Sequence, residues 1–196
     1  MRSDRSEDQA GMTLIELTVA LALLGVFLVA ALGTFASGWR GAADLDRETV
    51  RQAEARAAMD TLVADLRQAH TGDTALPPVT AVSTRAITFH SPDRAQPHHI
   101  RRIRYRVTGT VLERSVTTST NTGAPPWTFP AEGRWVPVAD GVQAGTIFTA
   151  RDATGAATTT AAAVRRVEIA LAVDIGRAQN ATARQWDVTV DLRSGS

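Results

Sequence analysis

Two different helical patterns follow one another in the first third of the chain. Residues 17–39 contain no charged side chain, which leaves 23 residues for a helix that crosses a membrane. At ~1.5 Å per residue this length is sufficient for a hydrocarbon core about 30 Å thick. From residue 45 the pattern becomes rich in charges, and no Pro occurs before Pro77. The pattern therefore predicts one helix from about Thr13 to Ala69, whose first half suits a membrane and whose second half is amphipathic.

The second half of the predicted helix carries an apolar stripe with a helical period. The stripe consists of Met59, Leu62, Val63, Leu66 and Ala69. Residues three and four positions apart share one face of a helix, so we expect this face to pack on a sheet. The segment 70–73, which contains a Gly, is expected to end the helix.

The rest of the chain has the alternating pattern of β-strands. Ile103, Tyr105 and Val107 form one apolar face, with arginines at the positions between them. Thr108 and Gly109 are expected to form a two-residue hairpin turn. The last two strands alternate most strictly, as antiparallel strands with one buried face do. The expected strands are residues 86–89, 100–107, 111–116, 134–138, 146–149, 166–173 and 186–192.

Three segments have the composition of loops, and their positions complete the prediction of the fold. They are residues 117–130, 153–163 and 176–183, which are rich in Thr, Ser, Pro, Ala or Gly. The predicted fold class is α+β. A long N-terminal helix, with a transmembrane first half, packs through its second half on an antiparallel β-sheet domain.

Composition narrows the classes of function. The formal net charge of the 196 residues is +1, which argues against a general binder of nucleic acid or of anionic membranes. All 21 basic residues are Arg, and there is no Cys. The chain therefore has no thiolate for a metal site or for nucleophilic attack, and its fold is held without disulfides.

One acid interrupts the apolar region close to its start. Glu16 follows the stretch Gly11-Met12-Thr13-Leu14-Ile15, and the uncharged segment 17–39 follows Glu16. A carboxylate inside a membrane span costs about 2.5–3.5 kcal/mol on insertion scales, so such a group usually has a partner and a function. An ordinary secretory signal fits poorly, because the apolar region is too long and no small-residue cleavage site ends it.

This junction resembles the processing site of type IV pilin-like proteins. In that family a prepilin peptidase cuts after a Gly and methylates the new N-terminal amine, and an acid lies at the fifth position of the mature chain. The resemblance implies cleavage after Gly11, N-methylation of Met12 and a role for Glu16 in assembly. The leader is less basic than is usual in the family. The alternative is a plain one-pass membrane anchor.

The order of elements extends the resemblance along the whole chain. The strand Ile103–Val107, the following Leu112-Glu113-Arg114 and the late Val-rich strand are most similar to the J-type minor pseudopilin of type II secretion. PilW-like minor pilins of type IV pili share much of this pattern. The expected organisation is a leader at 1–11, a transmembrane and assembly segment at 12–39, an amphipathic helical half at 40–70 and a β domain at 71–196.

The resemblance also implies how Glu16 acts. In a helical assembly of pilin-like subunits the carboxylate of one chain faces the N-terminal amine of its neighbour, and the attraction sets the register of the staggered helices. The alternative is that Glu16 only reaches the cytoplasmic headgroups.

Other polar clusters are weaker candidates for a site. His90, Asp93, His98 and His99 lie close in sequence, but without the helix-spaced ligands of a metal site. Asp140, Asp152 and Asp174 match no calcium loop. Arg102, Arg104 and Arg106 invite comparison with phosphate-binding surfaces, but the sequence shows no aromatic platform beside them, which favours a solvated or partner-facing surface.

The sequence thus predicts a non-enzymatic pilin-like subunit without a cofactor or bound metal. Its expected partners are other minor and major pilin-like subunits, prepilin peptidase and the assembly platform of the inner membrane, and nucleic acid is not expected. The expected location is the inner membrane, crossed once, with the C-terminal domain on the periplasmic side. Its function would be to prime or tip a filament for type II secretion. The alternative is a minor pilin of a type IV pilus or of a competence system that contacts DNA.

Overall fold

The first element of the fold is one long helix. The computed structural model describes residues 13–73, 75–96, 98–131, 133–175 and 183–192. The chain divides into two compact units, Met1–Arg47 and Glu48–Ser196, and we name the second the β unit. Helix α1 comprises Leu14–Arg67, or 54 residues, which confirms the prediction of a single helix.

Helix α1 ends where the sequence predicts. The amides of Gln68 and Ala69 donate to the carbonyls of Asp65 and Leu66 at 3.1 and 2.9 Å, so the last turn tightens to three-residue spacing. Gly72 follows with φ +66°, a backbone conformation that Gly adopts without steric cost. The chain then turns into the first strand.

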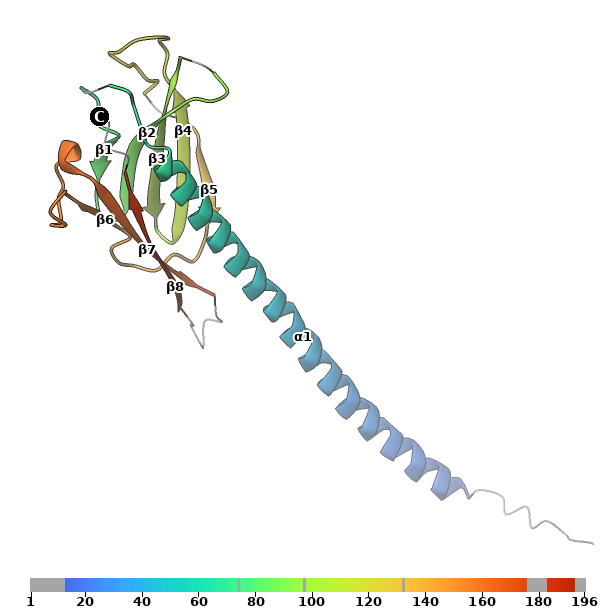
Figure 1. Cartoon of the computed structure of the whole chain (residues 1–196). Coiled ribbons are helices and arrows are strands. Elements are labelled where there is room, and N and C mark those ends of the chain that lie inside the picture. Colours follow the sequence, from blue (N-terminus) through green and yellow to red (C-terminus); the bar gives the residue numbers. More distant parts are fainter. Residues whose placement is uncertain (1–12, 74, 97, 132, 176–182, 193–196) are drawn as a thin grey trace, which may run out of the picture. The chain divides into compact units, whose positions relative to one another are not determined.

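In the described part of the chain, eight antiparallel strands form two sheets, where the sequence predicted one (Figure 1). The first sheet has the order β1-β2-β3-β4-β5, and the second has the order β6-β7-β8. Strand β1 lies in a segment for which no strand was predicted. The strands are β1 (Val79–Val82), β2 (Ala86–Pro92), β3 (Ile100–Thr108), β4 (Val111–Thr118), β5 (Trp135–Ala139), β6 (Phe148–Arg151), β7 (Arg166–Asp174) and β8 (Ala183–Asp191).

The hairpin between β3 and β4 corrects the predicted turn by one residue. Thr108 pairs with Val111, so the two turn residues are Gly109 and Thr110 rather than Thr108 and Gly109. Gly109 has φ +61°, and a positive φ at the first turn position is what a type II′ hairpin needs. Gly therefore occupies the position where a side chain would cause strain.

The predicted loops differ from the structure at their ends. Thr117 and Thr118 complete β4 instead of starting a loop. The predicted loop at residues 153–163 contains a short 3-10 helix, η1, at Ala161–Ala163. Most of the expected loop between the last two strands, residues 176–182, lies outside the described part of the chain, and its last predicted residue, Ala183, begins β8.

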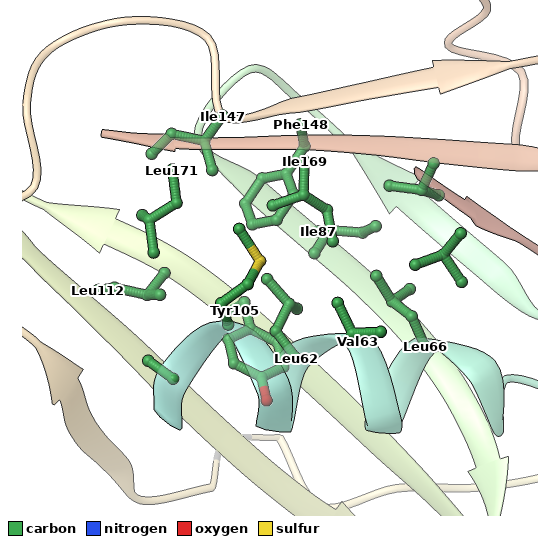
Figure 2. Close-up of a cluster of buried hydrophobic side chains, with 14 of the residues drawn as sticks. Leu62, Val63, Leu66, Ile87, Tyr105, Leu112, Ile147, Phe148, Ile169 and Leu171 are labelled. Carbon is green, nitrogen blue, oxygen red and sulfur yellow. The ribbon is translucent and has the colours of Figure 1, made fainter. Parts of the chain in front are cut away.

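One hydrophobic core joins the C-terminal turns of α1 to both sheets (Figure 2). Leu62 and Leu66 of the helix are fully buried, as are Ile103 of β3 and Leu171 of β7. Figure 2 shows helix side chains directed into the same cluster as side chains of β6 and β7. All five residues of the predicted stripe are buried, which confirms that this helix face packs on the β-structure. The α+β fold class, with an apolar N-terminal helix followed by antiparallel β-structure, is therefore confirmed.

A buried polar network attaches the last helical turns to the five-stranded sheet. The Oδ2 atom of Asp65 accepts hydrogen bonds from the hydroxyl of Tyr105 at 2.7 Å and from Nε of Arg114 at 2.8 Å. Burial, followed by the neighbouring Asp65 carboxylate, raises the pKa of the Tyr105 hydroxyl well above its usual value. The hydroxyl therefore stays protonated and donates, so Asp65 has two partners inside the core.

We name the sheet face opposite Ile103 and Tyr105 the outer face of the five-stranded sheet. His90 lies on this face, is only 3% exposed and packs its ring against Phe129 at 5.1 Å between centroids. Burial, with a smaller contribution from the charge of Arg102, lowers the pKa of His90 from 6.5 to about 4. The imidazole is therefore neutral in the folded protein at neutral pH.

Removing the Asp65 carboxylate should destabilise the β unit. Asp65→Ala leaves Arg114 and the Tyr105 hydroxyl without their acceptor, and breaking a buried pair of this kind costs about 3–5 kcal/mol. Urea unfolding of the full-length chain in detergent micelles measures the change in the free energy of unfolding. The matched control is Glu54→Ala on the exposed side of the same helix, with an expected change within about 0.5 kcal/mol. Equal effects of the two substitutions would contradict the role of the network.

The buried His90 should make the fold sensitive to acid. In the unfolded chain His90 binds a proton with a pKa near 6.5, while the folded protein resists protonation until about pH 4. The stability associated with His90 is complete above the unfolded pKa and is lost as the pH falls from about 6.5 towards 4. By linkage the loss is about 2 kcal/mol at pH 5. In His90→Gln the loss of unfolding free energy between pH 7 and pH 5 should be smaller than in the wild type by about that amount. An equal loss in both proteins would refute the assignment of this acid sensitivity to His90.

Candidate functional site

The N-terminal part of α1 exposes an unusual amount of apolar surface. Its segment Leu14–Ala36 has 23 residues and a mean hydropathy of 2.5, and it is long and apolar enough to cross a membrane. Most of the large apolar side chains that the described chain exposes lie in this segment, including Leu14 at 82% and Phe27 at 68% exposure. An apolar surface of this size indicates contact with lipid or with other chains.

Glu16 takes part in a reciprocal cap at the first turn of the helix. The Oε2 atom of Glu16 accepts hydrogen bonds from the amide of Thr13 at 2.9 Å and from its hydroxyl at 3.0 Å. The amide of Glu16 donates to Oγ1 of Thr13 at 3.3 Å. Thr13 and Glu16 are three positions apart, so this arrangement is a capping box that satisfies two otherwise free amides of the helix N-terminus.

The capping box makes Thr13 part of the site. This role of Thr13 was not predicted from the sequence. The signal was present in the sequence as Thr-x-x-Glu directly before an apolar run. Thr13 fixes the orientation of the Glu16 carboxylate towards the start of the helix. A negative charge there also interacts favourably with the helix dipole.

The arrangement leaves Glu16 with unused capacity for hydrogen bonding. Both bonds from Thr13 reach the same oxygen, Oε2. Oε1 has no partner among the residues that the structure describes. An ionised carboxylate accepts several hydrogen bonds, so a cation or another donor can bind Oε1 without breaking the cap. The predicted processing residues Gly11 and Met12 lie outside the described residues.

Two glycines in the apolar segment pack against none of the other described side chains. A Cβ atom added at Gly25 or Gly33 would meet no atom within 4 Å. Small residues allow close approach between membrane helices. Intrachain packing therefore does not explain the choice of Gly at these two positions.

In the cluster of His and Asp residues considered as a weak metal candidate, the side chains of Asp93, His99 and His90 have separate partners. Asp93 caps a turn by accepting from the amide of Ala95 at 2.9 Å and also accepts from the hydroxyl of Thr118. Nδ1 of His99 bonds to the carbonyl of Ser119 at 2.9 Å. His90 packs against Phe129. Among the described residues no group of three or more His, Cys, Asp or Glu is placed to hold a metal ion.

Two of the acids near Gly-containing turns have local structural roles. Asp152 accepts three hydrogen bonds within the turn that it begins, from the amide and hydroxyl of Thr154 and from the amide of Ala156. Asp140 accepts from the hydroxyl of Thr110 at 3.1 Å. These carboxylates order turns of the β unit.

The arginines of β3 differ from the sequence-based expectation. Arg102, Arg104 and Arg106, which we name the β3 arginines, lie on the outer face, as the alternation predicts. From the sequence no aromatic residues were expected beside them, but two aromatic rings contact their guanidinium groups. Phe129 lies under the guanidinium of Arg102, and Trp135 contacts both other guanidinium groups. The two aromatic residues come from a distant loop and from β5, so local sequence gave no signal for these contacts.

Comparison with known families assigns the N-terminal segment. Residues 8–32 match the prokaryotic N-terminal methylation motif, and this range includes Gly11, Met12, Thr13 and Glu16. The match ends within α1 and does not extend to the strands. No curated protein matches the chain with significant similarity. The motif, joined to a helix that is able to cross a membrane, supports a pilin-like protein anchored by a single span.

Proposed function

We propose that the chain is a minor pilin-like subunit, a pseudopilin, that primes or tips a pilus-like filament for type II protein secretion. The observation that carries the proposal is the methylation motif over residues 8–32, which overlaps the helical span Leu14–Ala36. Pilin-like proteins of this kind are typically structural, and we propose an assembly role without catalysis. The partners would be other minor and major pilin-like subunits, prepilin peptidase and the inner-membrane assembly platform.

Processing would divide the chain at the motif. In this proposal prepilin peptidase cleaves after Gly11 and methylates the amine of Met12, and residues 1–11 are the leader. Residues 12–39 form the membrane and assembly segment, residues 40–70 the amphipathic half of the helix, and residues 71–196 the β domain. The protein would cross the inner membrane once, with the β domain on the periplasmic side.

The proposed role of Glu16 is to set the register between subunits. Its carboxylate would pair with the methylated N-terminal amine of a neighbouring chain, because an unpaired carboxylate is costly in a membrane. The capping box supports this proposal in one respect: Oε2 is held by Thr13, while Oε1 has no partner among the described residues. The competing explanation is that Glu16 only caps its own helix.

Features of the β unit support the narrower assignment to the J-type minor pseudopilins. The β3–β4 hairpin with Leu112-Glu113-Arg114 and the buried helix stripe match the features of the resemblance. The second candidate is a PilW-like minor pilin of a type IV pilus or of a competence system. The feature that would serve contact with DNA in that case is the positive charge of the three β3 arginines on one sheet face.

Processing should depend on the peptidase. We expect the membrane-extracted protein to begin at N-methyl-Met12 in cells that contain prepilin peptidase and at Met1 in cells that lack it. Intact mass and N-terminal sequencing measure both states. A chain that begins at Met1 in both strains would contradict the proposal and would leave a plain one-pass anchor.

Assembly should require the charge of Glu16 rather than its capping bond. Glu16→Gln keeps a side-chain acceptor for the amide of Thr13, since Gln also serves in capping boxes, but it removes the negative charge. We expect the variant to be processed normally and to enter filaments at least about tenfold less than the wild type, the factor that a loss of ~1.4 kcal/mol gives. The measurement is the amount of subunit in sheared filament fractions.

Two further variants separate the explanations of Glu16. Thr13→Val removes the hydroxyl of the cap and retains the carboxylate, so we expect near-normal assembly. Glu48→Gln is the matched control for loss of an acid from the same helix. Normal incorporation of Glu16→Gln, or an equal defect in Thr13→Val, would favour the capping role alone.

A further inference from the structure

The outer face of the five-stranded sheet carries a cluster of arginines around one tryptophan. Thr88, Arg104, Ser115 and Trp135 lie opposite one another on β2, β3, β4 and β5, so they form one row across the sheet. The guanidinium of Arg104 lies 4.9 Å from the centre of the Trp135 ring, and that of Arg106 lies 3.9 Å from it. Both distances are within the range of cation–π contacts. Strands β2 to β5 are neighbours in this sheet (Figure 1).

The three β3 arginines carry more positive charge than the described acids beside them can neutralise. Nε of Arg106 pairs with Glu113 at 2.8 Å. Arg102 donates to the carbonyl of Pro130, and Arg104 donates to the hydroxyl of Ser115 at 3.4 Å, and both acceptors are neutral. Glu132 lies outside the described residues. Among the described residues, neither Arg102 nor Arg104 forms an ion pair with an acid.

Two of these arginines are partly buried and held in place by their neighbours. The Nε atoms of Arg102 and Arg104 are buried and have no acceptor among the described residues. The guanidinium of Arg102 is held at 5.1 Å over the ring of Phe129. A guanidinium that is already held by a ring and a carbonyl loses little further freedom when it binds, so the entropy cost of recognition is reduced.

We propose that the outer face, centred on Arg104 and Trp135, is a docking surface for a partner protein that presents Asp or Glu side chains. Planar guanidinium groups bind carboxylates through paired hydrogen bonds, and Arg and Trp are both enriched among the residues that contribute most to protein interfaces. The neutral hydroxyls of Thr88 and Ser115 on the same row provide further polar contacts. The inference does not depend on the class of filament proposed above.

The observations favour a protein over a nucleic acid. Single-stranded nucleic acids stack their bases on free aromatic faces, whereas two guanidinium groups already contact the Trp135 ring. Binding to a phosphate backbone also relies on an extended basic surface, while the whole chain has a net charge of only +1. A compact arginine cluster with few surplus charges suits a small group of carboxylates.

In-cell photo-crosslinking of the full-length protein tests the proposal. The photoreactive residue p-benzoylphenylalanine replaces Pro137, which is exposed on β5 two positions after Trp135. We expect an adduct with a protein segment that contains Asp or Glu, identified by mass spectrometry of the crosslinked peptide. Arg104→Glu should reduce the adduct at least about tenfold, because it places like charges opposite one another. The matched control, Arg184→Glu on β8, makes the same charge change on the other sheet and should leave the yield within about twofold.

Two further variants distinguish loss of binding from loss of folded protein. Replacing the acid of the crosslinked segment by Arg should restore the adduct to Arg104→Glu. Arg104→Gln, which removes the charge but keeps a polar side chain, serves as the test if Arg104→Glu lowers the amount of folded chain. An adduct with a segment that lacks acids, an adduct with nucleic acid, an adduct insensitive to Arg104, or no adduct from Pro137 would each overturn the proposal.

Discussion

The fold depends on the burial of one face of α1 against the β-structure. The fully buried Leu62 and Leu66 contribute about 1.5–3 kcal/mol each relative to exposure, and their neighbours come from both sheets. The sheets need this cover, because the apolar face of β3 would otherwise be in water. Asp65 is the polar exception on the buried face. Its bonds to Tyr105 and Arg114 give the contact a defined register that apolar packing alone does not provide.

The elements with a strong period were predictable from the sequence, and those defined by distant contacts were not. The stripe from Met59 to Ala69 and the alternation of β7 both have one buried face, so the pattern of apolar residues followed the structure. Strand β1 has only four residues, directly after Pro77 and Pro78, and an irregular register with β2, so its pattern is too short to predict a strand. The division into two sheets also depends on pairing between strands, which the order of residues along the chain does not specify.

The functional residues also divide into those that the sequence predicted and those that only the structure shows. Glu16 was predicted because an acid in an apolar run is conspicuous at the level of single residues. Thr13 was recognisable from its spacing to Glu16, but the sequence was interpreted through the acid alone. The contacts of Trp135 with Arg104 and Arg106 join β5 to β3 across an intervening strand. Such contacts become visible only when the order of strands in the sheet is known.

The shared helix α1 has a mechanical consequence. Residues 14–36 form the membrane-competent segment, while the last turns of the same helix form part of the core of the β unit. A force on the N-terminal half therefore reaches the β unit through the backbone of the helix and leaves the helix through buried side chains. The chain has no Cys, so no covalent crosslink shares this load. Detachment of the helix face from the sheets is then resisted by non-covalent packing and by the two hydrogen bonds of Asp65, while the backbone that joins α1 to β1 stays intact.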